Sequence, residues 1–109
     1  MPWLMRDEKV LAAVEVAESF RDRSRGLLGR DGFEGAFLIR PAHQVHSFGM
    51  RFPLDVAFCT KDMVVARTVL LKPGRITRPS IRCNCVIEAE AGAFARWELQ
   101  PGDVLEVEQ

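Results

Sequence analysis

The chain has 109 residues, of which 48% are hydrophobic and 28% are charged, and its formal net charge at pH 7 is zero. This length and composition predict one globular domain over residues 1–109, and zero net charge argues against a nucleic-acid partner. No apolar run approaches the roughly 20 residues that span a bilayer, and charges at positions 6–9 interrupt any leader-like segment, so we expect a cytoplasmic protein without a membrane span.

The first regular element expected along the chain covers residues 10–17. Its alternating pattern fits a helix or a strand, and its valine content favours a strand. One helix is predicted near residues 19–29, because Ser19 and Asp22 are spaced as in a capping box and apolar residues recur on one helical face after them.

The rest of the chain has the pattern of short strands separated by proline and glycine turns. Strands are expected over residues 36–39, 45–48, 54–59, 64–71, 85–90 and 104–108. The sequence therefore predicts a mainly β fold, a small β-barrel or β-sandwich with one helix.

Charge is distributed unevenly in the second half of the chain. Residues 63–87 contain five basic residues and no acid, whereas residues 88–109 contain six acids and one base. One interpretation is that neighbouring strands neutralise each other. The other is that the loop at residues 72–82, with Arg75 and Arg78, presents an anion-binding edge.

Residues 46–58 divide by parity if they form one strand, since side chains alternate between the two faces. The even positions are almost entirely apolar and the odd positions are small or polar. His46 falls on the apolar side, either as a buried core histidine or as a pocket base. Arg51 and Asp55 share the polar side, where a bend at Pro53 would join them as an ion pair or as part of a polar pocket.

Residues with metal-binding or acid–base chemistry form no recognisable motif. His43 and His46 would point to opposite faces of a strand, and the sulfurs of Cys83 and Cys85 would lie too far apart for a disulfide. Glu88 alternates with apolar neighbours, as a solvent-facing strand residue does. We therefore expect no metal site and no cofactor.

Four short sequences together resemble one family. They are R-G-L-L-G-R at 25–30, H-S-F-G-M-R-F-P-L-D-V-A-F at 46–58, E-A-E-A-G at 88–92 and P-G-D at 101–103. They are similar to the bacterial and archaeal family known as domain of unknown function one-ninety-two. The resemblance implies a compact, mostly β fold and no particular activity. It places the family signature at these residues: Arg25, Gly26, Leu27, Arg30, Phe48, Met50, Pro53, Leu54, Asp55, Gly92, Gly102 and Asp103.

Three hypotheses for function follow. The favoured one is a non-catalytic binding module for a small polar or anionic ligand or a peptide segment. Its candidate binding residues are Arg51 and Asp55, with His46, Arg75 and Arg78 beside them. The second is a structural or protein-interaction domain that uses an exposed strand edge. The third, and least favoured, is a hydrolase or transferase using His46 and Asp55.

Overall fold

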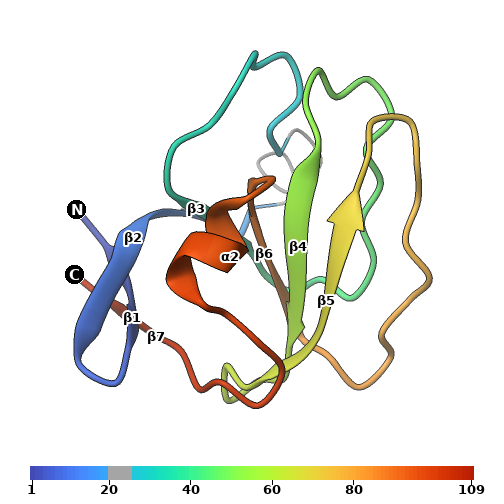
Figure 1. The fold of residues 1–109 in the computed structure, drawn as a ribbon. Helices are drawn as coiled ribbons and strands as arrows, with labels where there is room; N and C mark the ends of the chain where they lie inside the picture. Colours follow the sequence, from blue (N-terminus) through green and yellow to red (C-terminus); the bar gives the residue numbers. More distant parts are fainter. Residues whose placement is uncertain (20–25) are drawn as a thin grey trace.

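The computed structural model describes residues 1–19 and 26–109 (Figure 1). Among these residues, seven strands form one mixed sheet and a single short helix, α2 (Ala93–Trp97), packs beside it. The strands are β1 (Trp3–Arg6), β2 (Lys9–Ala17), β3 (Ala36–Ile39), β4 (Leu54–Cys59), β5 (Val65–Leu71), β6 (Cys85–Glu90) and β7 (Glu106–Glu108). The predicted mainly β fold is confirmed.

The helix predicted near residues 19–29 lies largely outside the described residues, and residues 26–29 form a turn. The described helix, α2, was not predicted. It contains five residues, far fewer than a helix needs to be stable in isolation. Contacts with the rest of the molecule must therefore stabilise it.

The strand order in the sheet is β5-β4-β6-β3-β2-β1-β7. The β2–β3 pair is parallel and every other neighbouring pair is antiparallel. Because β5 and β7 are the two edges and do not pair, the sheet is not closed into a barrel.

Each face of the sheet carries its own apolar core. The first core contains Leu4, Leu38, Ile87 and Leu105, together with Phe94 of α2. The second core lies on the opposite face. It is built from strand residues and from loop residues that fold over them: Phe37, Leu54, Val56, Phe58, Met50 and Phe52. Because both faces are covered, the central strands are apolar along almost their whole length.

The predicted strand over residues 45–48 does not form. His46 makes a single isolated bridge to Ile76, and the chain then turns at Phe48 and Gly49. The parity pattern holds from Met50 to Phe58, where the even positions are buried, but His46 and Phe48 are exposed. The interpretation of His46 as a core residue is therefore wrong, because the turn takes it out of the strand.

Residues 43–47 and 75–80 pair into an irregular ribbon over the second core, here called the ribbon. The backbone N–H of Ser47 donates to Arg75 O at 2.7 Å, and that of Thr77 donates to Val45 O at 2.9 Å. Ser47 is fully buried, and its hydroxyl donates to Lys72 O at 2.6 Å and accepts the Arg75 N–H at 2.9 Å. This one side chain ties the two halves of the ribbon together.

Candidate functional site

A pocket of about 440 Å³ opens on one side of the ribbon. Its base is formed by sheet residues Ile39, Leu54 and Glu88, and the turn at residues 26–28 and the ribbon form its walls. The volume is within the usual range for small-molecule sites. Among the described residues, the lining is formed by Gly26, Leu27, Leu28, Ile39, Pro41, Ala42, His43, Gln44, Val45, His46, Met50, Leu54 and Glu88.

Glu88 places a buried carboxyl at this pocket. It lies between Phe37 of β3 and Val56 of β4 in the sheet, and only 4% of its surface is exposed. Its side chain takes part in none of the hydrogen bonds or ion pairs found among the described residues. Burial raises the pKa of the Glu88 carboxyl from 4.5 to about 7, because desolvation disfavours the charged form.

The prediction that Glu88 faces solvent is wrong. Alternation along β6 places Glu88 on the same face as Val86, and that face carries the second core. The sequence pattern distinguishes the two faces of the strand. It does not reveal that loops within residues 26–53 cover the face that carries Glu88.

Polar groups of the ribbon lie at the pocket beside these apolar walls. His46 stacks on Phe48, with ring centroids 5.0 Å apart, and its Nδ1 accepts the Phe48 N–H at 3.2 Å. A neutral His46 with this bond carries its proton on Nε2 and presents a donor there. Gln44 donates from its amide to Thr77 O at 2.8 Å, which fixes its position on the ribbon.

Asp55 is occupied by the start of α2. Its Oδ2 accepts the backbone N–H of Gly92 at 2.9 Å and that of Phe94 at 3.0 Å. These N–H groups lie at a helix N-terminus, where they have no partner inside the helix. Asp55 therefore caps α2 from a neighbouring strand, and the predicted pairing of Asp55 with Arg51 is wrong.

Arg51 instead pairs with Asp31 at 2.9 Å, and the two side chains are 59% and 87% exposed. No hydrogen bond joins His46 to Asp55 among the described residues. In the described structure, the hydrogen bonds of His46 and Asp55 go to backbone N–H groups in different parts of the fold. The sequence-predicted candidates do not converge on one site.

Arg75 and Arg78 lie on the other side of the ribbon. They line a second hollow of about 510 Å³ between the ribbon and β5, together with Arg67 and Lys72. Of the five predicted binding residues, His46 therefore belongs to the pocket that contains Glu88, and Arg75 and Arg78 belong to this second hollow.

Most family-signature residues have evident contacts within the fold. Three are buried apolar residues of the second core: Leu27, Met50 and Leu54. Three are glycines with positive φ: Gly26, Gly92 and Gly102. Arg25 lies outside the described residues.

The remaining signature residues make individual contacts. Arg30 pairs with Glu15 at 3.1 Å, and the carbonyl of Pro53 accepts the Ala91 N–H at 3.1 Å. Asp103 binds Arg6 at 2.9 Å. Within this part of the signature, Phe48 is unusual in being half exposed beside the pocket residue His46.

The described part of the chain holds no group of three His, Cys, Asp or Glu side chains arranged to bind a metal ion. The three cysteines, Cys59, Cys83 and Cys85, are free thiols. None of the helices in residues 1–19 and 26–109 has the length and hydropathy of a membrane-spanning segment.

The fold and the pocket define a mainly β protein with one mixed sheet and a buried carboxyl at a ligand-sized hollow. The family described as DUF192 (uncharacterized ACR, COG1430) matches residues 3–107, and the chain belongs to this family. The resemblance drawn from the sequence is thereby confirmed. A comparison with curated proteins finds no match.

Two solved structures share the fold. A protein of unknown function from Novosphingobium aromaticivorans DSM 12444 superposes with a TM-score of 0.81 at 20% identity, covering 96% of this chain and 82% of that one. A protein from Sinorhizobium meliloti 1021 described as a candidate transcription regulator superposes with a TM-score of 0.80 at 22% identity, covering 97% and 91%. At these identities the likeness establishes the fold alone.

Proposed function

We propose that this protein is a binding domain for a small organic amine with an apolar body, and that Glu88 binds the ammonium group of the ligand. The observation that carries the proposal is the Glu88 side chain, which is 4% exposed and lacks a hydrogen-bond partner in the described structure. An isolated buried carboxylate is unfavourable unless a cation or a hydrogen-bond donor compensates it. A ligand that enters the pocket supplies that partner.

The character of the lining favours an amine over an anion. Among the described residues that line the pocket, none is Lys or Arg, and Glu88 is the one carboxylate. Leu27, Leu28 and Met50 line the pocket and would contact an aliphatic or aromatic body. Negative charge beside apolar walls therefore complements an ammonium group attached to a hydrocarbon.

The test compares ligands that share one skeleton and differ in one group: benzylamine, benzyl alcohol and benzoate. Binding is followed by thermal shift and titration calorimetry, with Glu88→Gln beside the wild type and Glu106→Gln, an exposed acid on β7, as the matched control. A ligand at about 100 times its Kd raises the free energy of unfolding by about 2.7 kcal/mol. We expect a shift for the amine alone, lost in Glu88→Gln and kept in Glu106→Gln.

The pH dependence provides a second readout. Amine binding should strengthen between about pH 6 and about pH 8, because Glu88 becomes ionised over this range. His43 and His46 line the same pocket, and the comparison with Glu88→Gln isolates the contribution of Glu88. Equal binding of the alcohol or benzoate, or unchanged amine binding by Glu88→Gln, would refute the proposal.

A further inference from the structure

Within residues 1–19 and 26–109, no strand pairs with the outer edge of β5 along most of its length. At its start, the backbone N–H of Val65 donates to Asp103 O, and its carbonyl accepts the Gly102 N–H, both at 2.8 Å. From Arg67 to Leu71, the described residues offer no backbone partner other than β4. In Figure 1 the chain leaves the tip of β5 and runs back outside it. Residues of both segments line the second hollow.

This hollow is basic, and we call it the basic groove. It is lined by Arg67, Lys72, Arg75 and Arg78, and none of the described residues that line it is an acid. None of these four cations takes part in the ion pairs found in the described structure. The interpretation that the acidic C-terminal stretch neutralises this loop is therefore not supported.

The guanidinium of Arg67 is held in place at the groove by contacts within the fold. It lies 4.3 Å from the Phe58 ring centroid, and its Nη2 donates to Arg78 O at 2.9 Å. Its Nε is buried and has no hydrogen-bond partner among the described residues. A buried donor without an acceptor is unfavourable, and a carboxylate in the groove is the acceptor that suits a guanidinium best.

The groove also has an apolar component. Leu70 and Ile76 are among its lining residues and are 59% and 58% exposed. Leu70 belongs to the sheet face opposite Arg67, because side chains alternate along β5. A ligand lying along this edge therefore meets cations on one face and an aliphatic side chain on the other.

We propose that the basic groove binds an extended acidic peptide, which adds to β5 as an eighth strand. Its backbone would pair with residues 67–71, and its carboxylates would face Arg67, Arg75 and Arg78. Because alternate side chains of the added strand share a face, the expected partner sequence alternates acidic with aliphatic residues. The observations behind this proposal are separate from those behind the proposed amine pocket, which lies on the other side of the ribbon.

The test uses a fluorescent five-residue peptide of alternating glutamate and valine, with binding measured by fluorescence anisotropy. Two further peptides carry the same sequence with alternate backbone nitrogens methylated, one in each phase. In an added strand, only one set of N–H groups points toward β5, so methylation should abolish binding in one phase and spare it in the other. This contrast separates strand pairing from simple charge attraction.

Arg75→Glu and Arg78→Glu test the charge contribution. Both side chains are exposed, so the changes should leave folding intact, which circular dichroism verifies. Arg82→Glu is the matched control, since Arg82 is exposed on the same loop and does not line the groove. We expect each groove variant to weaken binding by about tenfold or more, Arg82→Glu and Glu88→Gln to leave it unchanged, and added salt to weaken it in the wild type.

Three results would each overturn the proposal. The first is no binding by the wild type. The second is the same loss in Arg82→Glu as in Arg75→Glu, which would indicate attraction to overall charge. The third is equal binding of both methylated peptides, which would indicate an anion site without strand pairing.

Discussion

The carboxylate of Asp55 in β4 accepts the backbone N–H of Gly92, 37 positions along the chain, at 2.9 Å. With its second bond, to Phe94, this contact fixes the start of α2 against the sheet. Gly92 adopts a φ of 100°, a conformation in which glycine is favoured over residues with a Cβ. Asp55, a family-signature residue, thus has a defined role in the fold.

Asp55→Ala should lower the free energy of unfolding by about 1 to 3 kcal/mol, because two helix N–H groups lose their acceptor. Asp55→Asn should lose less, since its side-chain oxygen still accepts. Urea denaturation followed by tryptophan fluorescence measures both, with Asp62→Ala, in an exposed turn, as the control. An Asp55→Ala midpoint equal to that of the wild type would show that the cap contributes nothing.

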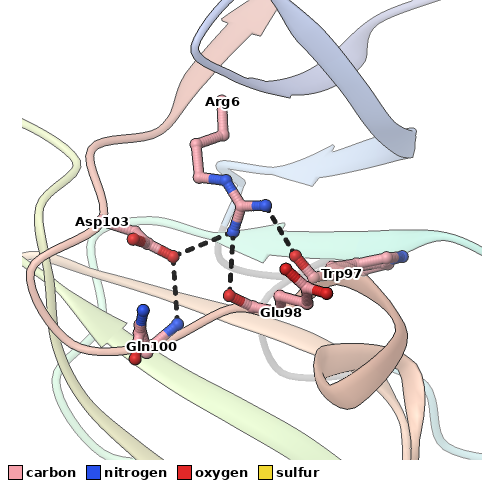
Figure 2. A network of polar contacts seen from close by, with 5 residues as sticks. All are labelled: Arg6, Trp97, Glu98, Gln100 and Asp103. Atoms are coloured by element: carbon pink, nitrogen blue, oxygen red, sulfur yellow. Dashed lines mark hydrogen bonds and ion pairs between the residues drawn. The ribbon is translucent and has the colours of Figure 1, made fainter.

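The opposite end of α2 is stabilised by Arg6 of β1 (Figure 2). Arg6 donates to the carbonyls of Trp97 at 2.7 Å and Glu98 at 3.1 Å and to the carboxylate of Asp103 at 2.9 Å, which also accepts the Gln100 N–H. Arg6→Lys should destabilise by about 1 to 2 kcal/mol, because one ammonium cannot reproduce the fork of a guanidinium.

A double-mutant cycle of Arg6→Lys and Asp103→Asn measures the coupling between these two side chains. We expect a coupling free energy of about 1 kcal/mol, since both side chains are only about one-fifth exposed. Strictly additive effects would mean that Arg6 acts through the two carbonyls alone.

Glu88 should make the wild type less stable as the pH rises. Its pKa is about 7 in the folded protein and 4.5 in the unfolded chain, so the folded state binds more protons between these values. The stability that this proton provides is fully present below about pH 4.5 and is lost as the pH rises through 7. Glu88→Gln lacks the titration and should be more stable than the wild type by about 3 kcal/mol at about pH 8.

Urea denaturation at about pH 5 and about pH 8 checks this difference. At the lower pH the two proteins should differ by less than about 1 kcal/mol. Glu106→Gln should follow the wild type at both values. A wild type whose stability rises relative to Glu88→Gln over this interval would contradict the buried, uncompensated state of the carboxyl.

Arg51→Ala should change stability by no more than about 0.5 kcal/mol, because Arg51 and Asp31 form an exposed ion pair. Comparing Arg51→Ala with Asp55→Ala in the same urea assay shows which of these two side chains contributes to stability. A loss for Arg51→Ala as large as that for Asp55→Ala would indicate a contact beyond this ion pair.

The sequence predicted most of the strands but missed β1 and α2. Residues 36–39, 54–59 and 85–90 form strands at the expected bounds, because each is an apolar run between turn residues. The strand β1 was missed because it is short and charged at one end. It forms because β2 and β7 pair with both of its edges. The helix α2 was missed for a related reason, since Asp55 and Arg6 stabilise it from distant parts of the chain.

The candidate site was predicted only in part. His46, Arg75 and Arg78 line hollows, but alternation along one strand could not reveal the turn at Gly49 that exposes His46. Glu88 was misassigned because its burial depends on loops that pack over the sheet. Both errors concern the burial of a side chain, which depends on tertiary packing and not on the local sequence pattern alone.

The ribbon is the common wall of the pocket and the basic groove. Val45 and His46 line the pocket, Ile76 and Thr77 line the groove, and the Thr77 N–H donates to Val45 O at 2.9 Å between them. A ligand that shifts the ribbon when it binds in the pocket changes the free energy of binding in the basic groove, and a ligand in the groove does the same to the pocket. Thermodynamic linkage requires such an effect to be reciprocal, so the factor by which a pocket ligand alters affinity in the groove is also the factor by which a groove ligand alters affinity in the pocket.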